Sequence, residues 1–261
     1  MSAPTSTVPT LSTDRRSRPS MATLTKIELR KSWDTRAGMW LLIAIAGLTA
    51  LIIVVALITA SSSDETWDNF FGIPSIVQAF LLPVLGILLV TSEWSQRTGL
   101  TTFTLVPLRA RIIQAKASAA VLLALAAVVF AGIVGAVVNL LGIATGGSGD
   151  WNLTSGHFGG IALLQVVNIM QGVAFGMLFL NSAAAIVVFY LLPIAWSILT
   201  NVVTSLHGVR DWLDLGTTSN PLSNGDRMDV TQWAQLGTSV LVWVALPLAV
   251  GIWRLLRSEV K

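Results

Sequence analysis

The stretch MWLLIAIAGLTALIIVVALITA, residues 39–60, contains no charged side chain. A helix of this length is about 33 Å long, because each residue adds about 1.5 Å. That is enough to cross the hydrocarbon core of a bilayer, which is roughly 30 Å thick. The stretch therefore predicts a membrane-spanning helix.

Uncharged stretches of comparable or greater length recur along the rest of the chain. They lie between Asp68 and Glu93, Lys116 and Asp150, Asp150 and Arg210, and Asp229 and Arg254. The longest of these windows would make a single helix of roughly 88 Å, so it must fold back and form two spans. We therefore predict an all-α, polytopic membrane protein with six spans, at about residues 39–60, 73–91, 117–143, 159–180, 184–204 and 233–253.

The composition agrees with insertion into a membrane. Hydrophobic residues make up 54% of the chain and charged residues 11%, whereas about a quarter of the residues in a soluble domain are charged. The mean hydropathy is +0.75, and a chain of 261 residues cannot cover that much apolar surface in a water-soluble core. The absence of cysteine excludes disulfides, thiolate metal sites and a cysteine nucleophile.

Basic residues concentrate in three segments, residues 15–36, 97–116 and 254–261. The positive-inside rule assigns such segments to the cytoplasm, and six spans place both termini on one side of the membrane. We therefore expect a multi-pass protein of the cell membrane, the bacterial inner membrane in particular, with cytoplasmic N and C termini. The net charge of +3 then reflects topology, and no nucleic-acid partner is expected.

The chain divides into a tail and one membrane domain. Residues 1–20 are rich in Ser, Thr, Pro and Arg and offer almost nothing to bury, so we expect a disordered tail before a six-span domain at residues 21–261. Residues 22–38 mix apolar and charged side chains, which predicts a short helix at the cytoplasmic interface. Residues 205–232 are too polar to cross lipid and predict short amphipathic helices in the outer leaflet.

The segment between the second and third predicted spans carries a distinctive pattern. It reads SEWSQRTGLTTFTLVPLRARIIQAKASA, residues 92–119. Glu93 and Arg97 are four residues apart and can pair on one face of a helix. Gly99 interrupts that helix, and Pro107 breaks the threonine-rich stretch that follows. The pattern resembles the permease subunits of the type-2 ABC exporter superfamily.

The resemblance, which covers about residues 22–261, implies an architecture and a docking element. It implies an N-terminal interfacial helix, a cytoplasmic coupling helix between spans two and three, and outer re-entrant helices between spans five and six. The coupling helix would seat on an ABC ATPase. The residues that the resemblance assigns to this coupling are Glu93, Arg97, Thr98, Gly99, Thr101, Thr102 and Phe103.

The same resemblance implies partners and a division of labour. Two ABC ATPase subunits would bind ATP and magnesium, and a second permease chain, identical or a sister, would complete the complex. This chain has no GxxxxGK[ST] phosphate loop, so we do not expect it to hydrolyse ATP or to bind a cofactor. Closure of the ATPases would rock the two permease halves and export a substrate by alternating access.

Polar side chains inside the predicted spans are the candidates for a substrate pathway. No ionisable residue lies inside those spans, so an ion or proton relay has no candidate groups, and a hydrophobic or amphiphilic cargo is favoured. The polar candidates are Gln78, Gln165, Asn168, Gln171 and Asn201. Three of them step by three residues along span four and cover about 120° of its face. Hydrogen bonding between helices is the alternative role for them.

The sequence contains none of the catalytic or metal-binding motifs that we looked for. There is no GxSxG, no HExxH and no carboxylate pair inside a span, so no catalytic residue is expected. His207 and Asp211 could share a metal ion, but two ligands seldom make a site, and no metal is expected. Gly172 and Gly176 form a GxxxG pair, which favours close helix packing.

Two alternatives to an exporter permease stay open. One is a six-span protein that relays ATPase motion or acts as an anchor without transporting, and the other is a secondary transporter.

Overall fold

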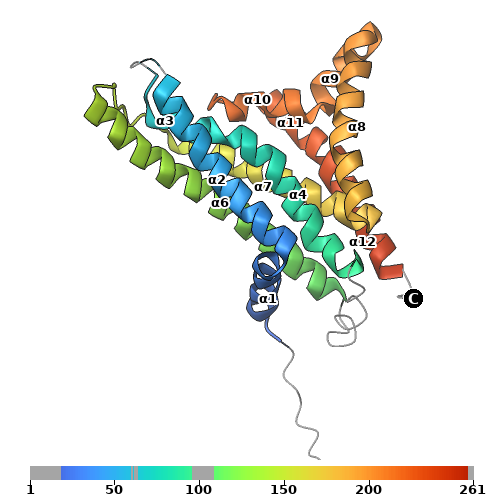
Figure 1. Cartoon of the computed structure of the whole chain (residues 1–261). Coiled ribbons are helices and arrows are strands. Elements are labelled where there is room, and N and C mark those ends of the chain that lie inside the picture. The colour runs from blue at the N-terminus through green and yellow to red at the C-terminus, as the bar shows by residue number, and fades with distance from the viewer. Residues whose placement is uncertain (1–18, 60, 62–63, 96–108, 258–261) are drawn as a thin grey trace, which may run out of the picture.

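The computed structural model describes residues 19–59, 61, 64–95 and 109–257, and this part of the chain is helical apart from short connections and one isolated bridge (Figure 1). Six of its helices are long and apolar enough to cross a membrane. They are α2 (Arg36–Thr59), α4 (Pro74–Ser95), α6 (Arg109–Thr145), α7 (Ser155–Phe179), α8 (Ser182–Val202) and the continuous unit Val230–Arg257. The prediction of an all-α, multi-pass membrane protein is confirmed.

All six spans differ from their predicted bounds, by eight residues at most. The helix α6 begins at Arg109, about two turns before the expected start at residue 117, because RARIIQAK consists largely of good helix formers. The last span contains three segments: α11 (Val230–Val240), a π-helical turn η2 (Leu241–Ala245) and α12 (Leu246–Arg257). Longer helices also place Glu93 and Lys116, which the prediction left just outside the spans, on α4 and α6.

A short helix, α1 (Met21–Asp34), precedes the first span. The side chain of Ser20 caps its N-terminus by accepting a hydrogen bond from the backbone N–H of Thr23 at 3.1 Å. Leu24, Glu28 and Ser32 are buried and are spaced four residues apart, so they lie on one face of the helix. That face packs mainly against α6, with further contacts to α2 and α4.

The centre of the bundle is the pair α4 and α7, which approach each other through glycines. A Cβ on Gly172 would lie 2.1 Å from the carbonyl oxygen of Pro83, and one on Gly86 would lie 2.4 Å from that of Ile169. Small residues of this kind let two helix backbones come close in a membrane. Gly176 faces Ile87 on α4 in the same way, so the GxxxG pair packs within the chain, as predicted.

The two ends of the bundle are built differently. At one end lie α1 and the chain's C-terminal helix α12; at the other lie four short elements (Figure 1). These short elements are α3 (Trp67–Gly72), η1 (Thr204–Leu206), α9 (His207–Leu213) and α10 (Leu215–Ser223). We call these the α1 end and the α10 end. Figure 1 shows α8 leaning away from the other spans towards the α10 end, and few residues of α8 are buried.

Candidate functional site

A cavity of about 320 Å³ lies between α4, α7, α8, α10 and η2. Its walls are mostly apolar, with a small number of polar groups. Ligand sites in proteins share this composition and typically enclose about 300–1,000 Å³. Because α7 runs through the middle of the bundle and α8 leans outward, the cavity forms where the central pair of helices meets the diverging one (Figure 1).

One face of α7 supplies three amide side chains to this cavity, Gln165, Asn168 and Gln171. The Nε2 atom of Gln165 donates to the carbonyl oxygen of Ser75 on α4 at 3.0 Å, and Asn168 Nδ2 lies 3.5 Å from Gln165 Oε1. Gln171 is 4% exposed, and within the described part of the chain no side-chain hydrogen bond is formed by it. Gln165 therefore ties two helices together, whereas Gln171 is free to bond a molecule in the cavity.

Two tryptophans form the wall opposite α7. Trp196 comes from α8 and Trp243 from the π-helical turn, and their rings meet edge to face with centroids 6.3 Å apart. The indole N–H of Trp243 donates to the carbonyl oxygen of Leu213. The indole nitrogen of Trp196 is buried and has no hydrogen-bond partner among the described residues. Buried tryptophan N–H groups usually find an acceptor, and this one has none in the described part of the chain.

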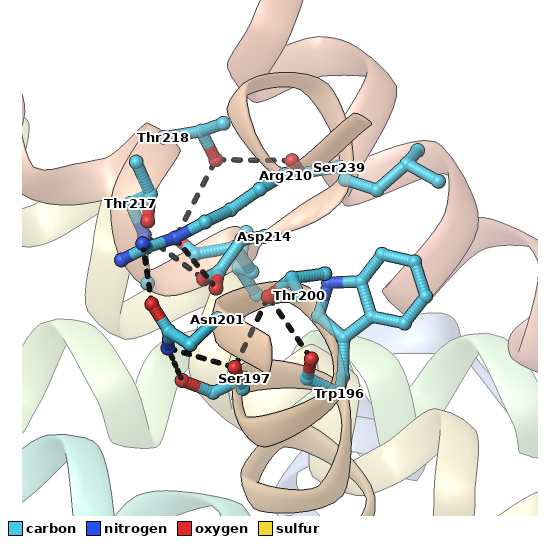
Figure 2. Close-up of polar contacts among 12 residues, drawn as sticks. Trp196, Ser197, Thr200, Asn201, Arg210, Asp214, Thr217, Thr218 and Ser239 are labelled. Atoms are coloured by element: carbon cyan, nitrogen blue, oxygen red, sulfur yellow. Dashed lines mark hydrogen bonds and ion pairs between the residues drawn. The ribbon is translucent and has the colours of Figure 1, made fainter. Parts of the chain in front are cut away.

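The N-terminus of α10 contributes to the lining of the cavity. Asp214 caps this helix, since its Oδ1 accepts the backbone N–H of Thr217 at 3.0 Å. The Nε atom of Arg210 lies 3.8 Å from Asp214 Oδ2, and Arg210 Nη1 donates to Asn201 Oδ1 at 3.0 Å. Figure 2 shows this group of contacts linking the end of α8 to α9 and α10. The charge of Asp214 is thus balanced from outside the cavity.

A second set of contacts fixes α10 to the last span. Thr218 Oγ1 donates to Ser239 Oγ at 3.0 Å, and Ser239 Oγ donates to the carbonyl oxygen of Trp212 at 2.9 Å (Figure 2). Both Thr218 and Ser239 are buried. Buried, satisfied hydrogen bonds of this kind hold neighbouring elements in one arrangement. The wall that α10 contributes to the cavity is therefore anchored to α11.

Two of the predicted pathway residues lie elsewhere. Gln78 is fully buried, its Nε2 donates to the carbonyl oxygen of Ala127 at 2.9 Å, and Thr49 Oγ1 lies 3.5 Å away. Asn201 sits exposed near the end of α8, where its amide donates to the carbonyl oxygen of Ser197 at 2.7 Å. Neither lines the cavity, so for Gln78 the alternative role, hydrogen bonding between helices, describes what is observed.

A cluster of four charges occupies the α1 end; it comprises Glu28, Lys31, Glu93 and Lys116. Lys116 Nζ lies 2.7 Å from Glu28 Oε2 and 3.1 Å from Glu93 Oε1. Lys31 Nζ lies 2.7 Å from Glu28 Oε1 and 2.6 Å from Glu93 Oε1. Glu28, Glu93 and Lys116 are buried. We call this group the charge cluster; it joins α1, α4 and α6, and its charges balance.

Burial and pairing act in opposite directions on Lys31. Burial by itself lowers the pKa of its ammonium group, but the carboxylates of Glu28 and Glu93 outweigh this and raise the pKa above its ordinary value. Lys116 also donates to the carbonyl oxygen of Leu89 at 2.9 Å, near the end of α4. Charges this deeply buried persist only when paired in this way.

Of the predicted coupling residues, Glu93 is the one that the described part of the chain includes, and it belongs to the charge cluster. Glu93 lies two residues before the end of α4 and directs its carboxylate toward lysines on α1 and α6. The other predicted coupling residues, Arg97, Thr98, Gly99, Thr101, Thr102 and Phe103, lie outside the described residues. The pairing of Glu93 with Arg97 and the coupling helix stay predictions.

At the α10 end a buried histidine connects three elements. His157 Nδ1 lies 2.6 Å from Asp68 Oδ1 on the α3 helix, and Nε2 lies 3.1 Å from the carbonyl oxygen of Ser223 at the end of α10. His157 itself stands near the start of α7 and is buried. Through these two contacts, His157 links α7 to α3 and α10.

Sequence reasoning missed several members of both sites. It found the three amides on α7 through their spacing, but not Trp196, Trp243 or Asp214, which reach the cavity from other elements. It used Lys116 as the boundary of an uncharged stretch and assigned it no partner. A usable signal existed for two members of the charge cluster, because Glu93 and Lys116 directly border apolar stretches.

Comparison with known proteins adds no identification. No protein-family model matches this chain, and no curated protein matches it.

Proposed function

We propose that this chain is the membrane-spanning permease subunit of an ABC transporter of the type-2 exporter class, which moves a hydrophobic or amphiphilic substrate out of the cell. The observation that carries the proposal is the charge cluster. It joins α1 to α4 and α6, the two helices that flank residues 96–108, where the sequence pattern of the exporter permeases lies. A force applied to that segment would reach both helices at once.

The surface of α1 supports its placement at the cytoplasmic interface. Trp33 and Ile27 are exposed beside the charged Lys26 and Arg30, whereas the opposite face of the helix is buried. An amphipathic helix with such an outer surface suits the boundary between lipid and water. In the proposal, the α1 end is cytoplasmic and the α10 end faces outward, where α9 and α10 would lie in the outer leaflet.

The proposed complex contains two copies of an ABC ATPase and a second permease chain, identical or a sister. ATP and magnesium would be bound by the ATPase subunits, and this chain would perform no catalysis. ATP-driven closure would favour one of two packings of the permease halves, because the ATPases bind the two packings with different affinity. The cavity beside Gln171 would be part of the substrate pathway.

The proposal is tested by native mass spectrometry of the chain, gently purified from its own cells. The expected result is a complex of two permease chains with two ATPase subunits, whose masses also decide between homodimer and heterodimer. A chain that emerges alone or only with itself, under conditions that preserve other such complexes, would contradict the proposal. That result would favour a secondary transporter or a membrane anchor.

Two single variants test whether the segment that resembles the coupling helix binds the ATPase. Arg97→Ala is expected to reduce the amount of co-purified ATPase, because Arg97 belongs to the proposed coupling helix. Lys26→Ala, which removes an exposed charge from α1, serves as the control and should leave the complex intact. Equal recovery of the ATPase with both variants would remove Arg97 from the docking site.

A further inference from the structure

We propose that the cavity between α4, α7, α8, α10 and η2 binds an uncharged amphiphile that carries hydrogen-bonding groups at two depths. This inference rests on the proposed function, because it names the class of cargo. It follows from four features of the cavity: its elongation, its apolar walls, its two unpartnered polar groups and its balanced charge.

The cavity is elongated along the bundle. Its lining on α7 extends from Ile161 to Gln171, a distance of about 15 Å at about 1.5 Å per residue. Gln171 lies roughly 12 Å from the end of α7, whereas Trp196 lies roughly 21 Å from the adjoining start of α8 by the same rise. Gln171 is therefore the deeper of the two polar positions, and Trp196 lies closer to the α10 end.

The walls between these positions suit an apolar chain or ring system. They are formed largely by Ile76, Ala79, Ile161, Leu164, Val167 and Pro193. On the α10 side, Gly216, Ser219 and Ser223 have short side chains, and the hydroxyls of both serines donate to backbone carbonyls of their own helix. The apolar body of a ligand would lie against the walls and beside these small residues.

Two polar groups in the lining have no partner in the described part of the protein. The amide of Gln171 can both donate and accept, and the indole N–H of Trp196 can only donate. A buried polar group that lacks a partner is unfavourable. A hydroxyl, ester or amide of the ligand near Gln171 would satisfy that amide, and a second acceptor would satisfy Trp196 after a small turn of its ring, because the indole nitrogen is buried.

The charge of the lining selects against ions. Among the described residues that line the cavity, Asp214 has the only ionisable side chain. Its carboxylate already accepts the Thr217 N–H and faces Arg210. An anionic head would be repelled by Asp214, and a cationic head would compete with Arg210 for the Asp214 carboxylate. An uncharged head meets neither obstacle.

The test compares three photoreactive probes that share one acyl chain bearing a diazirine: a monoacylglycerol, a fatty acid and an alkyltrimethylammonium ion. The full-length chain is placed in phosphatidylcholine nanodiscs, and the labelled residues are mapped by mass spectrometry. The monoacylglycerol is expected to label the α7 and α8 walls of the cavity saturably. Both charged probes should label these walls several-fold less.

Variants in the cavity lining then test whether labelling depends on the Gln171 amide and on the free volume of the cavity. Gln171→Leu should weaken monoacylglycerol binding about fivefold, which corresponds to one hydrogen bond. Ala79→Phe should abolish labelling by filling the cavity, and it keeps the inference testable should Gln171→Leu fail to fold. Gln114→Leu makes the same exchange at an exposed position on α6 and should change nothing.

Three outcomes would overturn the inference. The first is unsaturable labelling spread over the lipid-facing surfaces of α2 and α8. The second is equal labelling by charged and uncharged probes, or labelling unaffected by both cavity variants. The third is a phospholipid retained at one copy per chain that the monoacylglycerol does not displace, since this would make the occupant a resident lipid instead of cargo.

Failure here is distinguishable from failure of the proposed function. The binding experiment needs no ATPase, so absent binding beside an intact ATPase complex would remove only the cargo assignment. Saturable binding to a chain that forms no ATPase complex would leave the cavity as a ligand site and overturn the transporter proposal.

Discussion

The two ends of this helical bundle hold their elements together by different means. At the α1 end, four charged side chains from three helices form a closed set of ion pairs. At the α10 end, neutral hydrogen bonds and one histidine link hold short helices beside a cavity, and within the described residues the Trp196 indole N–H and the Gln171 amide have no hydrogen-bond partner. A buried ion pair is intolerant of a missing member, because the remaining charge is left uncompensated, whereas partly satisfied neutral groups can accept a ligand as a partner. The comparison indicates that the α1 end is held in one arrangement, whereas the α10 end has a cavity that can accept a ligand.

The largest expected effect comes from breaking the charge cluster. Lys116→Met would leave Glu28 and Glu93 buried with one cation between them. Removing one partner of a buried pair typically costs about 3–5 kcal/mol, so thermal unfolding in detergent should shift strongly downward. Lys26→Met, at an exposed position of α1, should change the free energy of unfolding by less than about 0.5 kcal/mol.

A double variant sharpens this result. Lys116→Met combined with Glu93→Gln removes one charge of each sign, so the double variant should be more stable than Lys116→Met alone. Groups in direct contact depart from additivity in this way. Simple addition of the two single effects would show that the four charges do not act as one cluster.

A smaller effect is expected at the glycine contact between α4 and α7, in the centre of the bundle. Gly172→Ala would place a Cβ 2.1 Å from the carbonyl oxygen of Pro83, and overpacking of this kind costs about 1–3 kcal/mol. Gly159→Ala on the same helix meets no atom within 4 Å and should be neutral or slightly stabilising. Comparable unfolding temperatures for the two variants would contradict the close approach of α4 and α7.

The α10 end should loosen on its own when its histidine link is removed. His157→Phe loses the contacts to Asp68 and to the Ser223 carbonyl, which together amount to about 1–3 kcal/mol. Hydrogen exchange should accelerate in α3 and α10 and stay unchanged in α1. Faster exchange at both ends would show that the ends are not independent.

The smallest effect concerns pH. The pKa of Lys31 is raised in the folded protein, so its contribution to stability is complete below the unfolded value of about 10.4 and is lost as pH rises through the folded value. Because about a third of this side chain is exposed, the contribution is at most about 1 kcal/mol. A spin label at Lys26→Cys in the cysteine-free chain should gain mobility only above about pH 10.4, and Lys31→Met should remove that response.

The sequence predicted the spans better than the sites. Gln165, Asn168 and Gln171 were expected to share a face of one helix and do line one cavity, because helical periodicity is a local property. The partners of Glu93 were not foreseen: Lys31 precedes it by 62 residues, and local spacing had suggested Arg97. Gln78 belonged to the same set of polar candidates, yet its amide bonds Ala127 on a different helix.

The sequence by itself determined that this chain contains six helices long and apolar enough to cross a membrane. Hydropathy is a local quantity, and the thickness of a bilayer converts each uncharged stretch directly into a helix. The tertiary structure alone decided which polar groups are paired and which face a cavity. Those relations depend on helices far apart in the chain and on the close approach of α4 and α7 at Gly172, and a single helix contains no information about its neighbours.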